Sequence, residues 1–135
     1  MESLTGRLLW DLVKHLKQWL LNLNRAGDKR KQEALQALRQ VILVARETQV
    51  YMRHHQQHQT SDAKTEAYLS TQWTELAFLL KDLGLGKLAK RCDIKGRYWA
   101  DPKQFDQDFI EKADIGLERI EHLARLLVRE IESRG

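Results

Sequence analysis

The chain has 135 residues and a mass of 15.9 kDa, which is the usual size of one domain. Hydrophobic residues make up 42% and charged residues 31%, with 1 Pro and 7 Gly, and this composition excludes collagen-like, low-complexity and strongly disordered chains. The 23 Lys and Arg against 19 Asp and Glu leave a net charge of +4, which is well below that of strongly cationic nucleic-acid modules.

The first predicted helix runs from Thr5 to Asn24, because leucines recur there at steps of three and four residues. Gly27 is expected just past its end, and Asp28 is expected as the N-cap of the next helix. The short turn predicts that these two helices are antiparallel neighbours.

The second predicted helix runs from Lys29 to His58, and the third runs from Ala63 to Leu83. Thr60, Ser61 and Asp62 supply turn and capping residues between them. Both segments carry one main apolar stripe at helical spacing, as expected of helices that line a common core.

The regular pattern breaks between Gly84 and Asp101. A short helix is predicted over Leu85 to Cys92, followed by an irregular stretch from Lys95 to Pro102. Asp101 followed by Pro102 is a helix start signal, and the fourth helix is predicted from there to Glu132.

These elements predict an all-α fold with a single domain over residues 1–135. The expected architecture is an antiparallel up-down-up-down four-helix bundle, with the short extra helix in the connection between helices 3 and 4.

Several apolar residues fall outside the main stripes of the first three helices. Scattered exposed apolar side chains are normal, but their grouping on three helices favours an interface. The predicted interface residues are Trp10, Val13, Leu21, Leu43, Val50, Ala67, Thr74 and Phe78. A small-residue stripe on the third helix would let a second backbone come close, and we expect a homo-oligomer or a partner protein there.

Basic residues cluster in two segments, 25–31 and 87–103, which would share one pole of an up-down bundle. Cations beside aromatic rings can hold phosphates and stack on bases, so nucleic-acid binding is the alternative hypothesis. The candidate anion-binding residues are Arg25, Lys29, Arg30, Lys31, Lys87, Lys90, Arg91, Lys95, Arg97, Tyr98 and Trp99. The competing interpretation is structural: Tyr98 and Trp99 close the end of the bundle, and opposite charges pair within it.

Residues with catalytic or metal-binding chemistry do not form a recognisable site. No carboxylate or Cys lies at metal-ligand spacing beside His54, His55 and His58, so these histidines are expected to be exposed to solvent. Cys92 is expected to be a small buried hydrophobe. We therefore expect no catalytic activity, no metal and no cofactor.

The single cysteine and the absence of a signal sequence or an apolar run of membrane length favour a cytoplasmic protein without a membrane partner. The sequence thus predicts a protein-interaction or assembly module that self-associates, with nucleic-acid binding as the alternative.

Overall fold

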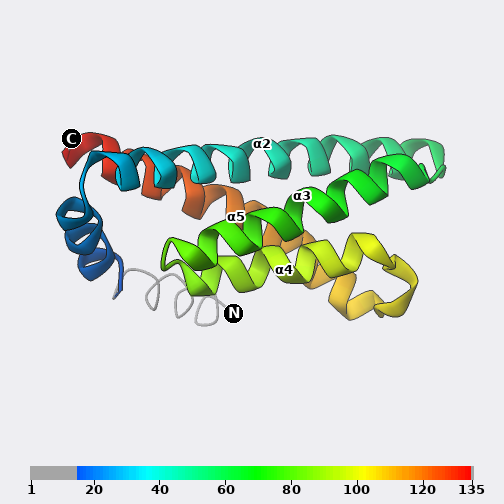
Figure 1. The fold of residues 1–135 in the computed structure, drawn as a ribbon. Coiled ribbons are helices and arrows are strands. Elements are labelled where there is room, and N and C mark those ends of the chain that lie inside the picture. Colours follow the sequence, from blue (N-terminus) through cyan, green and yellow to red (C-terminus); the bar gives the residue numbers. More distant parts are fainter. Residues whose placement is uncertain (1–14, 135) are drawn as a thin grey trace.

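The computed structural model describes residues 15–134, with side chains for all of these except 107, 109–115 and 134. Within this range the chain is helical: residues 15–26, α2 (Asp28–His58), α3 (Ala63–Asp82), α4 (Gly86–Ala100) and α5 (Gln107–Arg134), with a 3-10 turn η1 (Pro102–Gln104) before α5 (Figure 1). No strand occurs in these residues, so the all-α class is confirmed.

The bounds of α2 and α3 agree with the predicted helices to within one residue. Side chains on helical spacing are buried in both, as the apolar stripes predicted. The largest fully buried side chains include Leu38, Leu69, Trp73, Leu76, Leu80, Leu88, Ile120 and Ile131. One core therefore draws on α2, α3, α4 and α5.

Helix α4 corrects the prediction for the connection after α3. In place of a short helix and an irregular stretch, one helix continues to Ala100. Leu88, Cys92 and Trp99 lie on one helical face and are buried, which anchors the whole length of α4. Gly96, which lies in the stretch predicted to be irregular, instead lets the backbone of α4 come close to α3.

The start of the last long helix also differs from the prediction. Asp101 makes no side-chain capping hydrogen bond, and Pro102 begins η1 rather than α5. The α-helix starts at Gln107, because the chain turns through η1 first. The helical spacing of apolar residues also predicts that Phe109 and Ala113 are buried in this helix, but both side chains lie outside the described ones.

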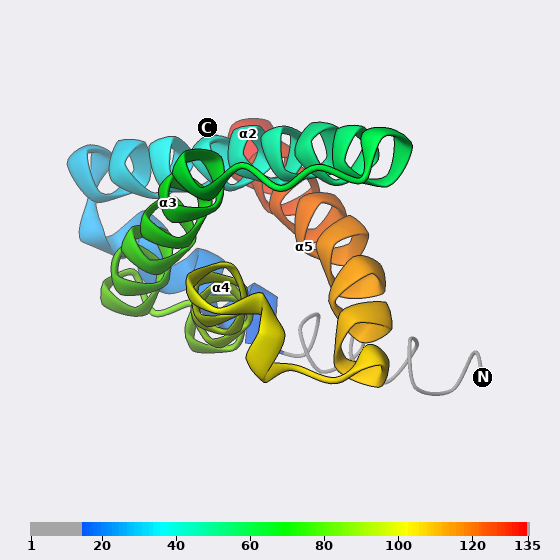
Figure 2. The same cartoon turned by 90° about the vertical axis from the view of Figure 1, so that its right-hand side faces the viewer.

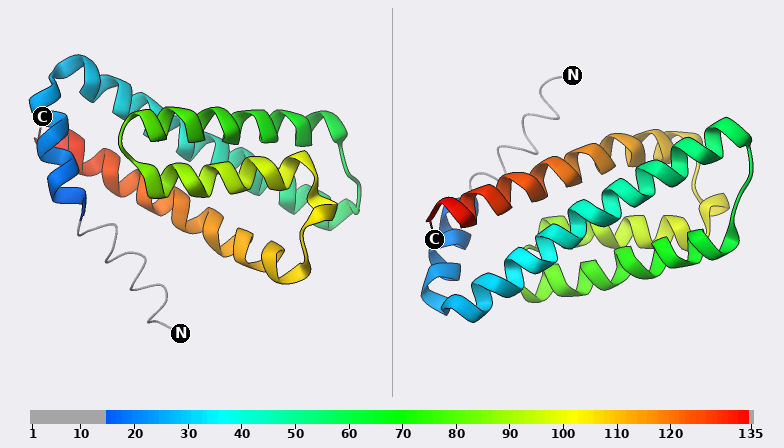
Figure 3. Two further views of the ribbon diagram at one scale, coloured as in Figure 1. Left: turned by 60° about the horizontal axis from the view of Figure 1, so that its bottom comes forward. Right: turned by 90° about the horizontal axis from the view of Figure 1, so that it is seen from above.

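The helices α2, α3 and α4 follow one another with reversed directions, and α4 packs along α3 (Figure 1). Helix α2 lies over both α3 and α5, as the end view and the view from above show (Figures 2 and 3). The helical residues 15–26 lie across the end where α2 begins (Figure 1). These residues do not run alongside α2, so the antiparallel packing predicted for the first two helices is wrong for residues 15–26.

Candidate functional site

A groove of about 630 Å³ lies between the second half of α2 and the first half of α3. Leu43 and Val50 line it from α2 with 55% and 57% of their surface exposed, and Tyr68 lines it from α3 with 43% exposed. Leu43 and Val50 are seven residues apart, which is two helical turns, so both lie on one face of α2. The groove therefore presents these apolar side chains to solvent, with Arg46 and Glu47 between Leu43 and Val50 on the same face of α2.

The core between the same two helices is held by a buried polar contact. The Thr48 hydroxyl donates to the Val44 carbonyl at 2.7 Å and accepts from the Trp73 indole N–H at 3.0 Å. The polar groups of Thr48 and Trp73 thus have hydrogen-bond partners, although both residues are almost fully buried. This link holds α2 and α3 in register where the groove forms.

One end of the groove is closed by the Tyr51 hydroxyl. It donates to Glu66 Oε2 at 2.5 Å and accepts from the backbone N–H of Asp62 at 2.9 Å. Burial, and next the hydrogen bond to the Glu66 carboxylate, raise the pKa of Tyr51. Tyr51 thus ties the end of α2 to the first turn of α3.

Charged groups of both signs line the groove. Glu47 accepts from the Tyr68 hydroxyl at 3.4 Å. Asp62 caps α3 by accepting from the backbone N–H of Lys64 at 3.3 Å, and its other carboxylate oxygen accepts a hydrogen bond from Thr65 Oγ1 at 2.6 Å. That hydrogen bond is the main reason why the pKa of Asp62 is lowered. Arg46 donates from Nε to Glu121 of α5 at 3.0 Å. Carboxylates therefore lie on the α3 side of the groove, and the cation lies on the α5 side.

Five of the predicted interface residues are exposed: Leu21, Leu43, Val50, Ala67 and Phe78. Trp10 and Val13 lie outside the described residues. Thr74 is half-buried against α4, where a Cβ on Gly96 would overlap its hydroxyl oxygen. The backbone that comes close to the small residues of α3 is thus α4 of the same chain, which corrects the prediction for Thr74.

Two exposed apolar residues were not among the predicted interface residues: Tyr68, and Leu79 at 50% exposure. They are 11 residues apart in the sequence, about three helical turns, and so lie on one flank of α3. This spacing could have identified both residues, but the interface on α3 was predicted on the neighbouring flank, which carries the small residues.

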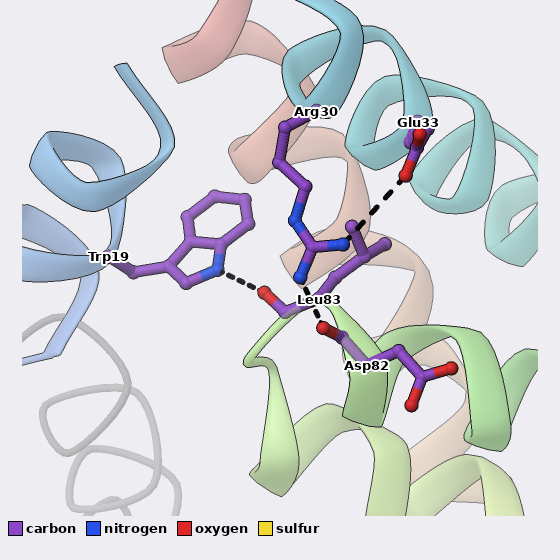
Figure 4. A network of polar contacts seen from close by, with 5 residues as sticks. All are labelled: Trp19, Arg30, Glu33, Asp82 and Leu83. Carbon is purple, nitrogen blue, oxygen red and sulfur yellow. Dashed lines mark hydrogen bonds and ion pairs between the residues drawn. The ribbon is translucent and has the colours of Figure 1, made fainter. Parts of the chain in front are cut away.

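Arg30, one of the basic residues near Gly27, contacts the end where α3 stops (Figure 4). The Trp19 indole N–H donates to the Leu83 carbonyl at 2.8 Å, and Arg30 Nη2 donates to the Asp82 carbonyl. Carbonyls at a helix C-terminus lack partners within the helix and carry the negative end of its dipole. Arg30 therefore caps α3.

A small apolar pocket of about 170 Å³ lies beside this turn, with Leu16, Trp19, Leu88 and Leu127 among its lining residues. It is well below the volume of typical small-molecule sites. The groove between α2 and α3 is the larger candidate.

The predicted single basic pole is wrong. Since α4 is continuous, Lys87 lies in its first turn, next to the end of α3, while Arg97 lies in its last turn at the opposite end. Lys95 and Trp99 are buried, with 6% and 7% of their surface exposed. Trp99 packs edge-on against Tyr51 at a ring separation of 5.5 Å, as the structural interpretation of the aromatic pair expected.

Other cations of the predicted anion-binding set are also engaged or partly covered. Arg97 Nε lies 3.2 Å from Asp93 Oδ2. Arg91 is half-buried, and burial followed by the nearby charge of Arg119 lowers its pKa. Tyr98 packs edge-on against Trp99 at 4.9 Å. The exposed cations of the set are Arg25, Lys29, Lys87, Lys90 and Arg97, with Lys31 half-buried.

His54, His55 and His58 are exposed, and His54 and His58 lie with ring centroids 4.4 Å apart. Across residues 15–134, no cluster of three or more His, Cys, Asp or Glu side chains is arranged to hold a metal ion. Cys92 is buried, and desolvation raises the pKa of its thiol to about 12. A thiol with that pKa is a poor nucleophile at neutral pH.

None of the described helices combines the length and apolar character that a membrane crossing requires. No match to the chain was found among protein-family models, curated proteins or solved structures. The functional argument therefore starts from the groove itself.

Proposed function

We propose that the protein is a non-catalytic, cytoplasmic assembly module that self-associates through the face formed by α2 and α3. The observation that carries the proposal is the set of exposed apolar side chains that line the groove: Leu43, Val50 and Tyr68. Exposed apolar side chains gathered in a groove usually mark a contact, because leaving them in water forfeits about 25 cal/mol for each Å² that a partner could cover. As the scaffold of this face we propose the up-down-up-down helical bundle.

The character of the groove supports a protein partner. Leu43 and Val50 provide aliphatic groups, Tyr68 adds an aromatic ring, and Arg46 and Glu47 lie between the two aliphatic side chains. Protein interfaces likewise combine apolar and aromatic side chains with hydrogen-bonding and charged groups. Grooves between two helices receive side chains of a partner helix in many recognition modules.

Nucleic-acid binding is the alternative function, and the exposed Lys29, Lys87 and Lys90 support it. These lysines lie toward the end of the molecule where α2 and α4 begin. The alternative is weaker than it was on sequence alone, since Arg30 caps a helix and Trp99 is buried. A ring inside the core does not stack on bases.

Size-exclusion chromatography with light scattering, recorded together with the absorbance ratio at 260 and 280 nm, separates these functions. Self-association predicts a mass above the 15.9 kDa of one chain and a protein-like absorbance ratio. Co-eluting nucleic acid that is lost at high salt would instead support the alternative. A mass of one chain at every concentration tested, without nucleic acid, would contradict the proposal.

A further inference from the structure

We propose that the groove between α2 and α3 receives Phe78 from a second copy of the chain, so that copies join head to tail. This inference rests on the proposed self-association and names the contact that produces it.

Phe78 is the most exposed large hydrophobic side chain among the described residues, at 63% of its surface. It lies one turn beyond Thr74, which meets Gly96 of α4. The antiparallel register therefore places Phe78 level with the turn of α4 that contains Lys90. An aromatic ring held on a rigid helix loses little conformational entropy when it docks, so it suits the role of an anchor.

The groove has room for such an anchor. Its volume of about 630 Å³ exceeds that of a phenyl ring several-fold, and Leu43, Val50 and Tyr68 offer aliphatic and aromatic contacts. Edge-to-face packing of Phe78 on Tyr68 would be the favoured ring geometry.

A chain cannot insert Phe78 into its own groove. Thr65, which lines the groove, is 13 residues before Phe78 on the same helix. At 100° and 1.5 Å per residue, the two side chains point about 140° apart and are separated by about 20 Å along α3. The occupant must come from another molecule.

The charges around the two surfaces are complementary in one orientation. Lys81 and Lys90 lie on the α4 side of Phe78, whereas Glu75 and Asp82 lie on its other side. At the groove, Glu47 and Asp62 lie toward α3, while Arg46 lies toward α5. Docking with the lysines over Glu47 and Asp62 brings opposite charges together on that side, and it places Glu75 and Asp82 beside the Arg46–Glu121 ion pair.

A contact between two different patches is heterologous. In a joined pair, one copy keeps an unused groove and the other keeps an unused Phe78, so addition continues until a ring closes or a chain of copies grows. This distinguishes the inference from a two-fold dimer in which groove packs on groove.

Two variants test the contact, one for each side. Phe78→Asp removes the apolar anchor. The double change Leu43→Asp with Val50→Asp places two carboxylates in the groove, so that it no longer binds an apolar ring. All three residues are exposed, so the folds should survive, and circular dichroism with a melting curve verifies this. Phe78→Ser provides a milder second anchor variant. Leu79→Asp is the matched control, because Leu79 is a neighbouring exposed apolar residue of α3 that does not line the groove.

Light scattering of each variant and of their mixture gives the result. We expect the anchor variants and the groove variant each to be one chain in mass, and Leu79→Asp to match the wild type. An equimolar mixture of Phe78→Asp with the groove variant should form a species of two chains and no larger, because one intact groove meets one intact anchor.

Other results separate the inference from the function it rests on. A wild type that is monomeric at all concentrations contradicts both. If the wild type assembles but Phe78→Asp and Phe78→Ser assemble equally well, self-association stands and the Phe78 contact is overturned. Failure of the mixture to form the two-chain species also overturns it.

Discussion

The hydroxyl of Ser70 in α3 donates a hydrogen bond of 2.8 Å to the carbonyl oxygen of Gly96 in α4. The two backbones are so close there that a Cβ on Gly96 would lie 3.2 Å from the Ser70 carbonyl oxygen and would overlap the Thr74 hydroxyl. This close approach aligns α3 with α4, and it accounts for a glycine inside a helix, where glycine normally costs stability.

Gly96→Ala should lower the free energy of unfolding by about 1–3 kcal/mol, because the added methyl group overpacks the contact with α3. Thr74→Ala in the same chain removes the overlapping hydroxyl oxygen and should recover part of the loss. Urea denaturation of the wild type, both single variants and the double variant measures the coupling. A Gly96→Ala variant as stable as the wild type would show that α3 and α4 are not in close contact at this position.

How far the sequence predicts this fold is clear from α2 and α4. The stripe of Ala34, Leu38, Val41 and Ala45 has an unbroken helical period, and the predicted bounds of α2 are nearly those observed. In α4 the same period continues through Leu88, Cys92 and Trp99. Gly96 and the charged residues beside it made this period hard to recognise, because sequence alone does not distinguish a glycine that lets a neighbouring helix come close from one that ends a helix.

The candidate site was predicted in part for a similar reason. The exposure of Leu43 and Val50 follows from their position opposite the stripe of their own helix. The role of Arg30 depends on a carbonyl 52 residues away, and no local pattern reports that distance. Sequence spacing predicts faces of helices well, but it does not predict which faces the tertiary structure covers.

Arg30→Gln should lower the free energy of unfolding by roughly 0.5–1.5 kcal/mol, since the α3 terminus loses a charged donor. Lys29→Gln is the matched control, because Lys29 is an exposed cation in the same turn of α2. Thermal and urea denaturation of both variants check this. Equal losses in the two variants would indicate an effect of net charge rather than of capping.

Tyr51→Phe should destabilise the protein by ~1–2 kcal/mol, because the contact between the end of α2 and the start of α3 loses one donated and one accepted hydrogen bond. Tyr68→Phe is the comparison, since the Tyr68 hydroxyl is exposed and makes one long contact to Glu47. We expect the comparison variant to stay within ~0.5 kcal/mol of the wild type. A larger loss for Tyr68→Phe than for Tyr51→Phe would contradict the role given to Tyr51 in tying α2 to α3.

The Cys92 thiol should react with a disulfide reagent only when the protein unfolds, because burial raises its pKa to about 12. The same shift makes stability depend on pH. The neutral thiol is present in both states below the ordinary pKa of about 8.5, and above it the unfolded chain ionises first, so the free energy of unfolding falls as pH rises toward the folded pKa.

The fall amounts to about 1.4 kcal/mol for each pH unit in that window, and Cys92→Ala should remove this component. Urea denaturation of the wild type and of Cys92→Ala at pH 7.5 and 9.5 measures this component, because all other titrating groups are common to both proteins. Equal pH dependence in the wild type and the variant, or rapid labelling of the native thiol, would refute the buried-thiol account.

Sedimentation velocity over a concentration series, for the wild type beside the Leu43→Asp and Val50→Asp double variant, tests most directly whether the α2–α3 face is covered by another molecule. We predict that the wild-type sedimentation coefficient increases with concentration, while the folded variant sediments as one chain throughout. Identical, concentration-independent sedimentation of both proteins at the rate of a single chain would contradict the account.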